Sequence, residues 1–195
     1  MSKIAVFGGT FNPFHIGHYK ILECLCGLDF IDKVFLLPDK IPPHKVCDYM
    51  PLDKHRIEMC EIICGEFSKA QLCLIDFERE GKSYTVDTIK ALKDKYPEDD
   101  FYFAIGGDML NTLDEWYNYE ELIRETSFIA FERESVEGFE KEVRKYKDLG
   151  AVIIPVFVDI PDVSSTDFRN NPDKALLPQK IYDYITEKGI YNVRQ

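Results

Sequence analysis

Several features that would direct a chain to nucleic acid, to a membrane or into a secreted scaffold are missing from this sequence. Its 24 Lys and Arg are outnumbered by 35 Asp and Glu over 195 residues, and the formal net charge is −11. This balance argues against the broad basic surface that nucleic acid or an anionic membrane requires, so we expect any anionic ligand to be bound by a local site. No stretch reaches the ~18 consecutive apolar residues of a membrane span, and MSKIAVFGG lacks the apolar core and cleavage site of a signal peptide. We therefore expect a cytoplasmic protein with neither nucleic acid nor membrane as partner.

Cysteine and histidine are sparse and are not arranged as metal ligands. None of the six cysteines belongs to a C-x-x-C pair, so neither a zinc ribbon nor a thioredoxin-like redox site is indicated. We expect free, mostly buried thiols at Cys24, Cys26, Cys47, Cys60, Cys64 and Cys73. Of the four histidines, two stand three residues apart near the N-terminus. That pair is the first feature that points to chemistry.

What is present indicates one globular α/β unit. With 45% hydrophobic and 13% aromatic residues, the chain can bury a substantial core, and we expect a single domain over residues 1–195. Short apolar, β-rich runs alternate with segments of helical period. The expected strands are 3–8, 33–37, 71–76, 101–106, 127–131 and 151–158, and the expected helices are 18–26, 51–63, 84–96, 119–123, 139–149 and a closing helix within 182–191. This series predicts a Rossmann-like, doubly wound, mainly parallel sheet with helices on both faces, whose ligands lie beyond the carboxyl ends of the strands.

The first strand runs into the segment GGTFNPFHIGH, which has the features of a phosphate-binding turn. Gly8 and Gly9 follow the strand, where the lack of a Cβ lets backbone N–H groups approach a phosphate. The segment is neither the G-x-G-x-x-G dinucleotide fingerprint nor a Walker loop, which needs Lys followed by Ser or Thr. It is therefore a phosphate loop of another type.

The two histidines of this segment are placed to bracket an anion. A helix is expected to begin near Ile16 or Gly17, and the spacing of His15 and His18 puts both imidazoles on one side of its first turn. That end of the helix carries the positive end of the dipole. A histidine pair that only caps the helix is one alternative, and a metal site is another, although the sequence offers no obvious third ligand.

A second candidate anion site follows the last strand. SSTDFR begins a helix, with Ser164 as its cap and Asp167 three residues later. Arg169 lies four residues after Ser165, so both side chains can face the same anion. Taken alone, the segment would fit an ordinary capped helix with a surface arginine equally well.

Both segments resemble motifs of one superfamily. GGTFNPFHIGH closely resembles the H-x-G-H signature of the nucleotidylyltransferases, and SSTDFR is similar to the S-S-T-x-(I/V)-R motif that grips ATP phosphates in its adenylyltransferases. The resemblance implies that His15, Gly17 and His18 supply the signature and that Thr10 and the glycines hold phosphates. It fits the chemistry, because in-line attack on an α-phosphorus needs positioning and charge stabilisation more than covalent help.

The middle of the chain indicates which family of adenylyltransferases the sequence resembles. PPHK, KSYTVDT, IGGDM and Trp116 match, in order, the pattern of the bacterial nicotinate-nucleotide adenylyltransferases, and the resemblance covers nearly the whole chain. That family transfers AMP from ATP to nicotinate mononucleotide, giving deamido-NAD and pyrophosphate in NAD biosynthesis. The resemblance thus implies ATP and nicotinate mononucleotide as small-molecule partners and leaves a homo-oligomer open.

The motifs and the resemblance together nominate three groups of site residues. The catalytic residues are His15, His18 and Arg169. The ATP-binding residues are Gly8, Gly9, Thr10, Phe11, His15, Gly17, His18, Gly106, Asp108, Arg133, Ser164, Ser165, Thr166 and Arg169. The residues that bind nicotinate mononucleotide are Gly9, Thr10, Lys45, Ser83, Tyr84, Thr85 and Trp116. Mg²⁺ is implied by the ATP, held chiefly by phosphates and water, and no protein ligand is assigned to it.

Several of these residues have a physical reading of their own. Lys45, in the stiff loop IPPHK, offers a point charge to a phosphate, or is only a solvated loop lysine. Ser83 and Thr85 start a helix whose free N–H groups can receive the carboxylate of nicotinate, although both could be plain caps. Asp108 follows a strand and two glycines, where a ribose would lie, and a capping role is its alternative. Trp116, in a polar setting, suits stacking on a pyridine ring, in competition with core packing.

Two arginines match family positions that carry basic residues near the ligands. They are Arg56, within the expected helix 51–63, and Arg133, after the strand 127–131, and either could be a surface charge. The chain also departs from the family in two places. The segment NNPDKA after Arg169 is shorter than the family's segment, which usually contributes to binding the triphosphate of ATP. Phe168 replaces a small branched residue.

Two other functions compete with this reading. Phosphopantetheine adenylyltransferase, or another H-x-G-H adenylyltransferase, shares both end motifs, but phosphopantetheine adenylyltransferase lacks the SYTVDT and Trp116 features. A nucleotide-sensing module without turnover would keep the glycine loop but would not need both histidines and Arg169.

Overall fold

The computed structural model describes residues 1–43, 50–132 and 138–193. Its framework is one sheet of six strands in the order β3-β2-β1-β4-β5-β6, with every pairing parallel. The strands are β1 (Lys3–Gly9), β2 (Lys33–Pro38), β3 (Ala70–Leu72), β4 (Asp100–Gly106), β5 (Ser127–Glu132) and β6 (Val152–Phe157). The strand order reverses between β1 and β4, so a crevice opens there at the carboxyl edge of the sheet.

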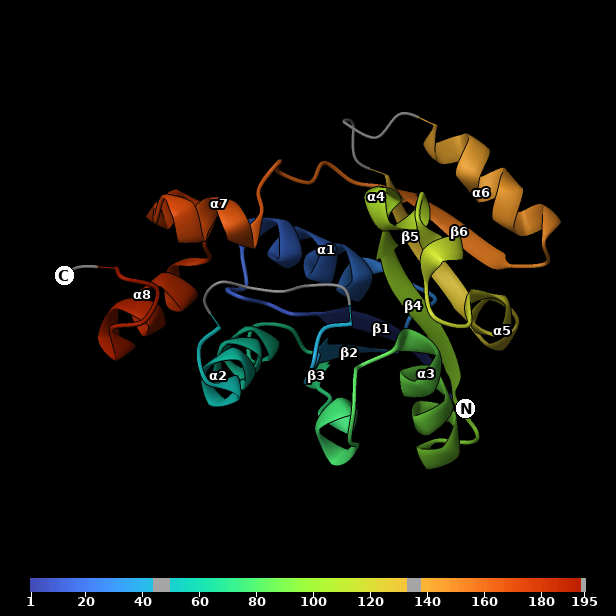
Figure 1. The fold of residues 1–195 in the computed structure, drawn as a ribbon, viewed down its shortest axis with the longest axis horizontal. Helices are drawn as coiled ribbons and strands as arrows, with labels where there is room; N and C mark the ends of the chain where they lie inside the picture. The colour runs from blue at the N-terminus through green and yellow to red at the C-terminus, as the bar shows by residue number, and fades with distance from the viewer. Residues whose placement is uncertain (44–49, 133–137, 194–195) are drawn as a thin grey trace.

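Helices cover both faces of the sheet. They are α1 (Ile16–Gly27), α2 (Asp53–Cys64), α3 (Thr85–Lys95), α4 (Gly107–Leu110), α5 (Tyr119–Glu125), α6 (Phe139–Asp148), α7 (Ser165–Asn170) and α8 (Gln179–Lys188), with short 3-10 turns η1 (Ile75–Glu78), η2 (Leu113–Glu115) and η3 (Lys174–Leu176). In Figure 1 the strands run through the middle, with α8 and the C-terminus at one end of the molecule and α6 at the other. The expected doubly wound α/β fold is confirmed.

Alternation along β1 explains why the sheet has two apolar faces. Ala5 and Phe7 belong to one core cluster, which α1, α2 and α8 complete, while Ile4 and Val6 belong to a second, completed by α3, α5 and α6. Successive side chains of a strand point to opposite faces, and a strand with both faces buried is apolar throughout. β1 is therefore the central strand, and its last residues lie at the crevice.

Some element boundaries differ from those expected. The expected strand 71–76 is wrong beyond Leu72, because Phe77 N–H bonds to Leu74 C=O and turns the chain into η1, whose Ile75 is buried in the core. An apolar run of this length fits a strand or a packed turn equally well. The first strand extends through Gly9, so both glycines end the strand instead of following it.

Two further expectations concern thiols and membranes. The five cysteines in the described ranges are free, as expected, but only Cys60 is fully buried and the others are half-buried; Cys47 lies outside those ranges. Within the same ranges, no helix combines the length and the apolar character needed to cross a bilayer.

Candidate active site

A cavity of about 360 Å³ lies at the crevice between β1 and β4. The loops and helix starts at the carboxyl ends of the strands line it. The sequence-predicted residues on its wall are Gly8, Gly9, Thr10, Phe11, His15, His18, Ser83, Tyr84, Thr85, Gly106, Asp108, Trp116, Ser164, Ser165, Thr166 and Arg169. The predicted Lys45 and Arg133 lie outside the described residues. The fold thus brings motifs from both ends of the chain to one cavity.

The turn after β1 is compact because a glycine admits an aromatic ring. A Cβ on Gly9 would lie 2.9 Å from Cε1 of Phe11, whereas at Gly8 the nearest atom would be 3.5 Å away. Phe11 itself has φ 47°, in the left-handed region that side chains rarely adopt. The ring of Phe11 lies so close to the backbone of residue 9 that a side chain there would collide with it. This contact is a reason for glycine at position 9 in addition to the expected access for a ligand.

The two signature histidines cap the helix that carries them. His15 is the N-cap of α1, and its Nδ1 accepts the N–H of His18 at 3.3 Å, while Nδ1 of His18 accepts the N–H of His15 at 3.2 Å. The rings stack with centroids 3.5 Å apart and an interplanar angle of 21°. Since both Nδ1 atoms accept, Nε2 carries the proton of each neutral ring. The capping alternative is correct, and it orients the two Nε2–H donors.

His18 is held on its other sides by aromatic side chains. Its ring centroid lies 5.0 Å from that of Phe11, 5.2 Å from Phe14 and 6.1 Å from Phe7. Gly17, predicted to bind ATP, does not line the cavity; a Cβ there would lie 3.0 Å from Cε1 of His15. Its role is to let the His15 ring fold back over α1.

The helix α7 begins with the predicted cap. Ser164 Oγ accepts the N–H of Asp167 at 3.1 Å, and the carboxylate accepts the N–H of Ser164 at 2.8 Å. Hydrogen bonds from the Ser164 side chain and backbone lower the pKa of Asp167. A capping box of this kind fixes the direction in which α7 enters the site.

Two side chains of α7 bond to the turn after β1. Ser165 Oγ donates to the carbonyl of Pro13 at 2.8 Å, and Arg169 Nη1 donates to the carbonyl of Asn12 at 2.7 Å. Arg169 Nη2 donates to Thr166 Oγ1 at 3.0 Å. Ser165 and Arg169 were expected to face the same anion. In the structure both side chains donate to backbone carbonyls of this turn, at the wall of the cavity.

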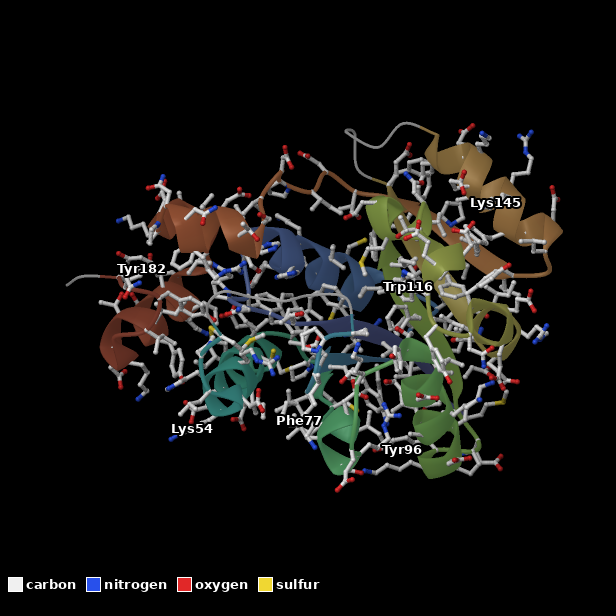
Figure 2. The ribbon with its side chains drawn as sticks, in the orientation of Figure 1. Lys54, Phe77, Tyr96, Trp116, Lys145 and Tyr182 are labelled. Carbon is white, nitrogen blue, oxygen red and sulfur yellow. The ribbon has the colours of Figure 1, made fainter. Side chains whose placement is uncertain are left out.

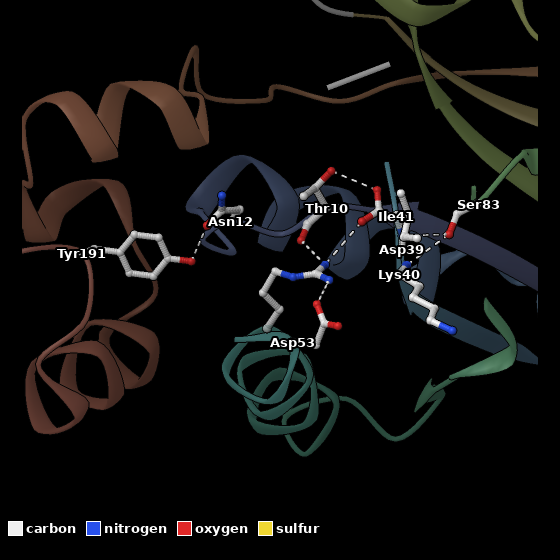
Figure 3. A network of polar contacts seen from close by, with 9 residues as sticks. Thr10, Asn12, Asp39, Lys40, Ile41, Asp53, Ser83 and Tyr191 are labelled. Atoms are coloured by element: carbon white, nitrogen blue, oxygen red, sulfur yellow. Dashed lines mark hydrogen bonds and ion pairs between the residues drawn. The ribbon is translucent and has the colours of Figure 1, made fainter. Parts of the chain in front are cut away.

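The start of α3 is built differently from the expectation. The helix begins at Thr85 with Tyr84 as N-cap, and no side-chain hydrogen bond caps it. Ser83 Oγ accepts the N–H of Lys40 at 3.0 Å and that of Ile41 at 3.4 Å, so it joins α3 to the loop after β2 and is not a cap (Figure 3). Free N–H groups at a helix N-terminus can in general receive an anion, and this helix start lies on the cavity wall.

Aromatic side chains line the cavity near α3. Trp116 is half-buried and lies beside β4 (Figure 2). Its ring is edge-on to that of Phe103, with centroids 6.2 Å apart and an interplanar angle of 85°. Tyr117, which is 55% exposed, packs on Tyr84 with centroids 4.4 Å apart. Trp116 therefore packs against the core and also presents a surface to the cavity.

Asp108 stands exposed on the cavity wall, in the first turn of α4. It does not cap that helix. A Cβ on Gly106 would lie 2.6 Å from Oδ1 of Asp108, so this glycine makes room for the carboxylate. The arrangement leaves the carboxylate on the cavity wall, where a ribose hydroxyl could reach it.

Arg56 is fully buried beneath the turn after β1, and its interpretation as a surface charge is wrong. Nη1 donates to the carbonyl of Thr10 at 3.0 Å and lies 3.3 Å from Asp39 Oδ1, and Nη2 bonds Asp53 at 2.6 Å (Figure 3). Thr10 Oγ1 closes the network on Asp39 Oδ2 at 2.9 Å. Arg56 thus braces the turn from below.

Two carboxylates of the site were missed by sequence reasoning. Asp39 lines the cavity one residue after β2, and an acid directly after a strand end was the signal that could have found it. Asp76, also on the wall, is buried and accepts bonds from Arg79 at 2.7 Å and from Thr88 at 2.7 Å. Only the turn into η1 places it there.

Comparison with known proteins gives the family context. A family model described as cytidylyltransferase-like matches residues 6–171. A probable nicotinate-nucleotide adenylyltransferase of Bacillus licheniformis is 38% identical over 98% of this chain and 99% of its own length, and the nicotinate-nucleotide adenylyltransferase of Bacillus subtilis is 37% identical over 98% and 99%. The structure of Plasmodium falciparum nicotinic acid mononucleotide adenylyltransferase complexed with APC has a TM-score of 0.84 at 23% identity, and its complex with NaAD has 0.81 at 24%. These two structures cover 100% of this chain and 99% of their own and share its fold.

Proposed function

The chain belongs to the cytidylyltransferase-like family and, within it, to the nicotinate-nucleotide adenylyltransferases, and from this membership we propose how its residues transfer AMP from ATP to nicotinate mononucleotide. The products are deamido-NAD and pyrophosphate. The observation that carries the proposal is the stacked His15 and His18 pair at the start of α1, set beside Arg169 of α7 on the wall of one cavity.

The reaction is a single in-line displacement. A phosphate oxygen of nicotinate mononucleotide attacks the α-phosphorus of ATP, the new P–O bond forms, and the bond to the pyrophosphate oxygen breaks. No side chain acts as nucleophile. Nε2–H of His15 and His18 and the guanidinium of Arg169 stabilise charge on the α-phosphate and on the leaving pyrophosphate, and the braces described above fix these donors before the substrate arrives.

The acceptor would occupy the side of the cavity formed by α3. The uncapped N–H groups at Thr85 suit the carboxylate of nicotinate, and Trp116 offers a face on which the pyridine ring can stack. Asp108, which also lines the cavity, suits a ribose of the ATP. In this proposal the two reacting phosphates lie between the two ligand sites, next to the histidine pair.

Mg²⁺ would enter with the ATP phosphates. Among residues 1–43, 50–132 and 138–193, no three His, Cys, Asp or Glu side chains are grouped to hold a metal ion. The carboxylates of Asp39 and Asp108 do reach the cavity wall, and a site with one or two carboxylates, phosphate oxygens and water suits this cation. When bound, the ion neutralises phosphate charge.

The test is an incubation of the purified protein with ATP, Mg²⁺ and one acceptor at a time, with pyrophosphate release as the readout. Nicotinate mononucleotide, nicotinamide mononucleotide and phosphopantetheine are the acceptors to compare. We expect the fastest release with nicotinate mononucleotide. Turnover with phosphopantetheine alone would instead support the rival adenylyltransferase, and nucleotide binding without release from any acceptor would support a sensing module.

A further inference from the structure

We propose that Tyr191, at the far end of the chain from the signature motif, is a positioning residue for Arg169 and the turn after β1. The inference rests on the proposed function. The Tyr191 hydroxyl donates to Oδ1 of Asn12 at 2.6 Å, across 179 positions of sequence. Figure 3 shows this contact. Both side chains are buried, with 3% exposure for Tyr191 and 2% for Asn12. A buried amide oxygen needs a donor, and this hydroxyl supplies one.

The ring of Tyr191 contacts the helix that carries Arg169. It packs edge-on against Phe168 with centroids 6.1 Å apart at 78°, and Phe168 is fully buried and directly precedes Arg169 on α7. The replacement of a small branched residue by Phe168 therefore creates a contact with the C-terminal segment. The hydroxyl of Tyr191 holds the turn, and the ring holds α7.

These two contacts bear on one hydrogen bond of the site. The carbonyl of Asn12 accepts a hydrogen bond from Nη1 of Arg169 at 2.7 Å. Tyr191 contacts Asn12, the acceptor residue, and also Phe168, the residue before the donor Arg169. Arg56 braces the same turn at Thr10, on the side of α2. Tyr191→Phe removes the donor that bonds Oδ1 of Asn12, and the Asn12 carbonyl that positions the guanidinium would shift with its side chain.

The backbone of Tyr191 indicates that its position is determined by these contacts. Its φ is 60°, in the left-handed region, two residues after Gly189, the C-cap of α8. Non-glycine residues hold this conformation only where the surrounding packing compensates for the strain. The chain is therefore turned so that the ring and the hydroxyl both face the site.

A purely structural role for Tyr191 predicts something different from a positioning role. A residue that only closes the core would change the stability of the protein but not the turnover of the folded enzyme. A positioning residue changes the use of ATP, because Arg169 is proposed to act on the ATP phosphates, and leaves the mononucleotide site unaffected.

The experiment compares Tyr191→Phe with the wild type well below both unfolding temperatures. We expect kcat/KM for ATP to fall about tenfold, as displacement of a catalytic group by a fraction of an ångström does, with KM for nicotinate mononucleotide unchanged. Tyr184→Phe is the matched control, because that hydroxyl bonds His55 Nδ1 at 2.6 Å and the carboxylate of Glu58 on α2, away from the cavity wall. It should keep the wild-type kcat/KM.

A double-mutant cycle tests the route through the arginine. In an Arg169→Ala background, Tyr191→Phe should change kcat/KM for ATP by less than about twofold, since the group it positions is gone. An equal loss in both backgrounds, or wild-type kinetics in Tyr191→Phe alone, would overturn the proposal. If Tyr191→Phe does not fold, Phe168→Leu removes the ring contact and must lower kcat/KM for ATP in the same selective way.

The outcomes for this inference and for the proposed function are separable. An active wild type with an equally active Tyr191→Phe refutes the positioning role alone. A wild type that neither releases pyrophosphate nor binds a non-hydrolysable ATP analogue refutes the proposed function, and the positioning role with it.

Discussion

His18 has two roles that three substitutions can separate. Its Nδ1 accepts the N–H of His15 at 3.2 Å, which caps α1, and its Nε2–H is proposed to stabilise charge on ATP phosphates. Alanine removes both groups. Asparagine can place an amide oxygen where Nδ1 lies and keep the cap, but it offers no donor at the Nε2 position. Glutamine reaches that position with an amide N–H.

The structure sets a different magnitude for each role. Loss of a capping group costs about 1 kcal/mol, which for a chain of this size lowers Tm by about 2–4 °C. Loss of one preorganised charge-stabilising donor lowers turnover by about 10²–10³. His18→Ala should therefore show both effects, and His18→Gln should recover part of the turnover. His18→Asn should show the loss of turnover with a smaller fall in Tm than His18→Ala, because it keeps the cap and loses only the ring contacts.

The assays are pyrophosphate release at saturating ATP and nicotinate mononucleotide and thermal unfolding followed by circular dichroism. The comparison depends on the asparagine variant, whose fold is the least disturbed. If folded His18→Asn turned over within a few-fold of the wild type, the assignment of the H-x-G-H segment as the catalytic element would be wrong, and the histidines would serve α1 alone.

Three further predictions concern other parts of the molecule. Arg56→Met should lower the free energy of unfolding by about 1–3 kcal/mol in urea titrations, because it removes the donors to the Thr10 carbonyl and to the Asp39 carboxylate. Asp53→Asn, at the half-exposed end of the network, should cost less, and equal losses would contradict the bracing role. The specificity constant should be at least about tenfold higher for nicotinate than for nicotinamide mononucleotide, because an amide would present N–H groups to the N–H groups of α3. Trp116→Ala should weaken the binding of both acceptors but keep most of the ratio of their specificity constants. Equal constants in the wild type would refute the carboxylate site. The pKa of Asp167 is lowered in the folded protein, so its contribution to stability is present above the usual pKa of 3.8 and is lost as pH falls through the folded value. The fall of Tm with decreasing pH should therefore be shallower in Asp167→Asn than in the wild type. An unchanged dependence of Tm on pH would show that the charge of the Asp167 cap contributes nothing.

The sequence alone determined the features that depend on short spacings. The His15 and His18 pair and the Ser164 and Asp167 cap both lie at i, i+3, where helix geometry brings side chain and backbone together regardless of the rest of the chain. The alternation of apolar runs and helical segments likewise predicted the parallel sheet and the edge where the site lies. The strand 71–76 was wrong in part because its length does not distinguish a strand from a packed turn.

Only the tertiary structure decided the contacts between distant segments. Arg56 could be placed under Thr10 only once α2 had packed against β2 and β3, and nothing in its local sequence distinguishes it from a surface arginine. Ser83 joins Lys40, and Tyr191 reaches Asn12, because the order of strands brings loops 43 and 179 positions apart to one crevice. The physical reason is the range of the interaction: local hydrogen bonds follow from backbone geometry, whereas burial and long-range pairing depend on how the whole sheet is ordered and covered.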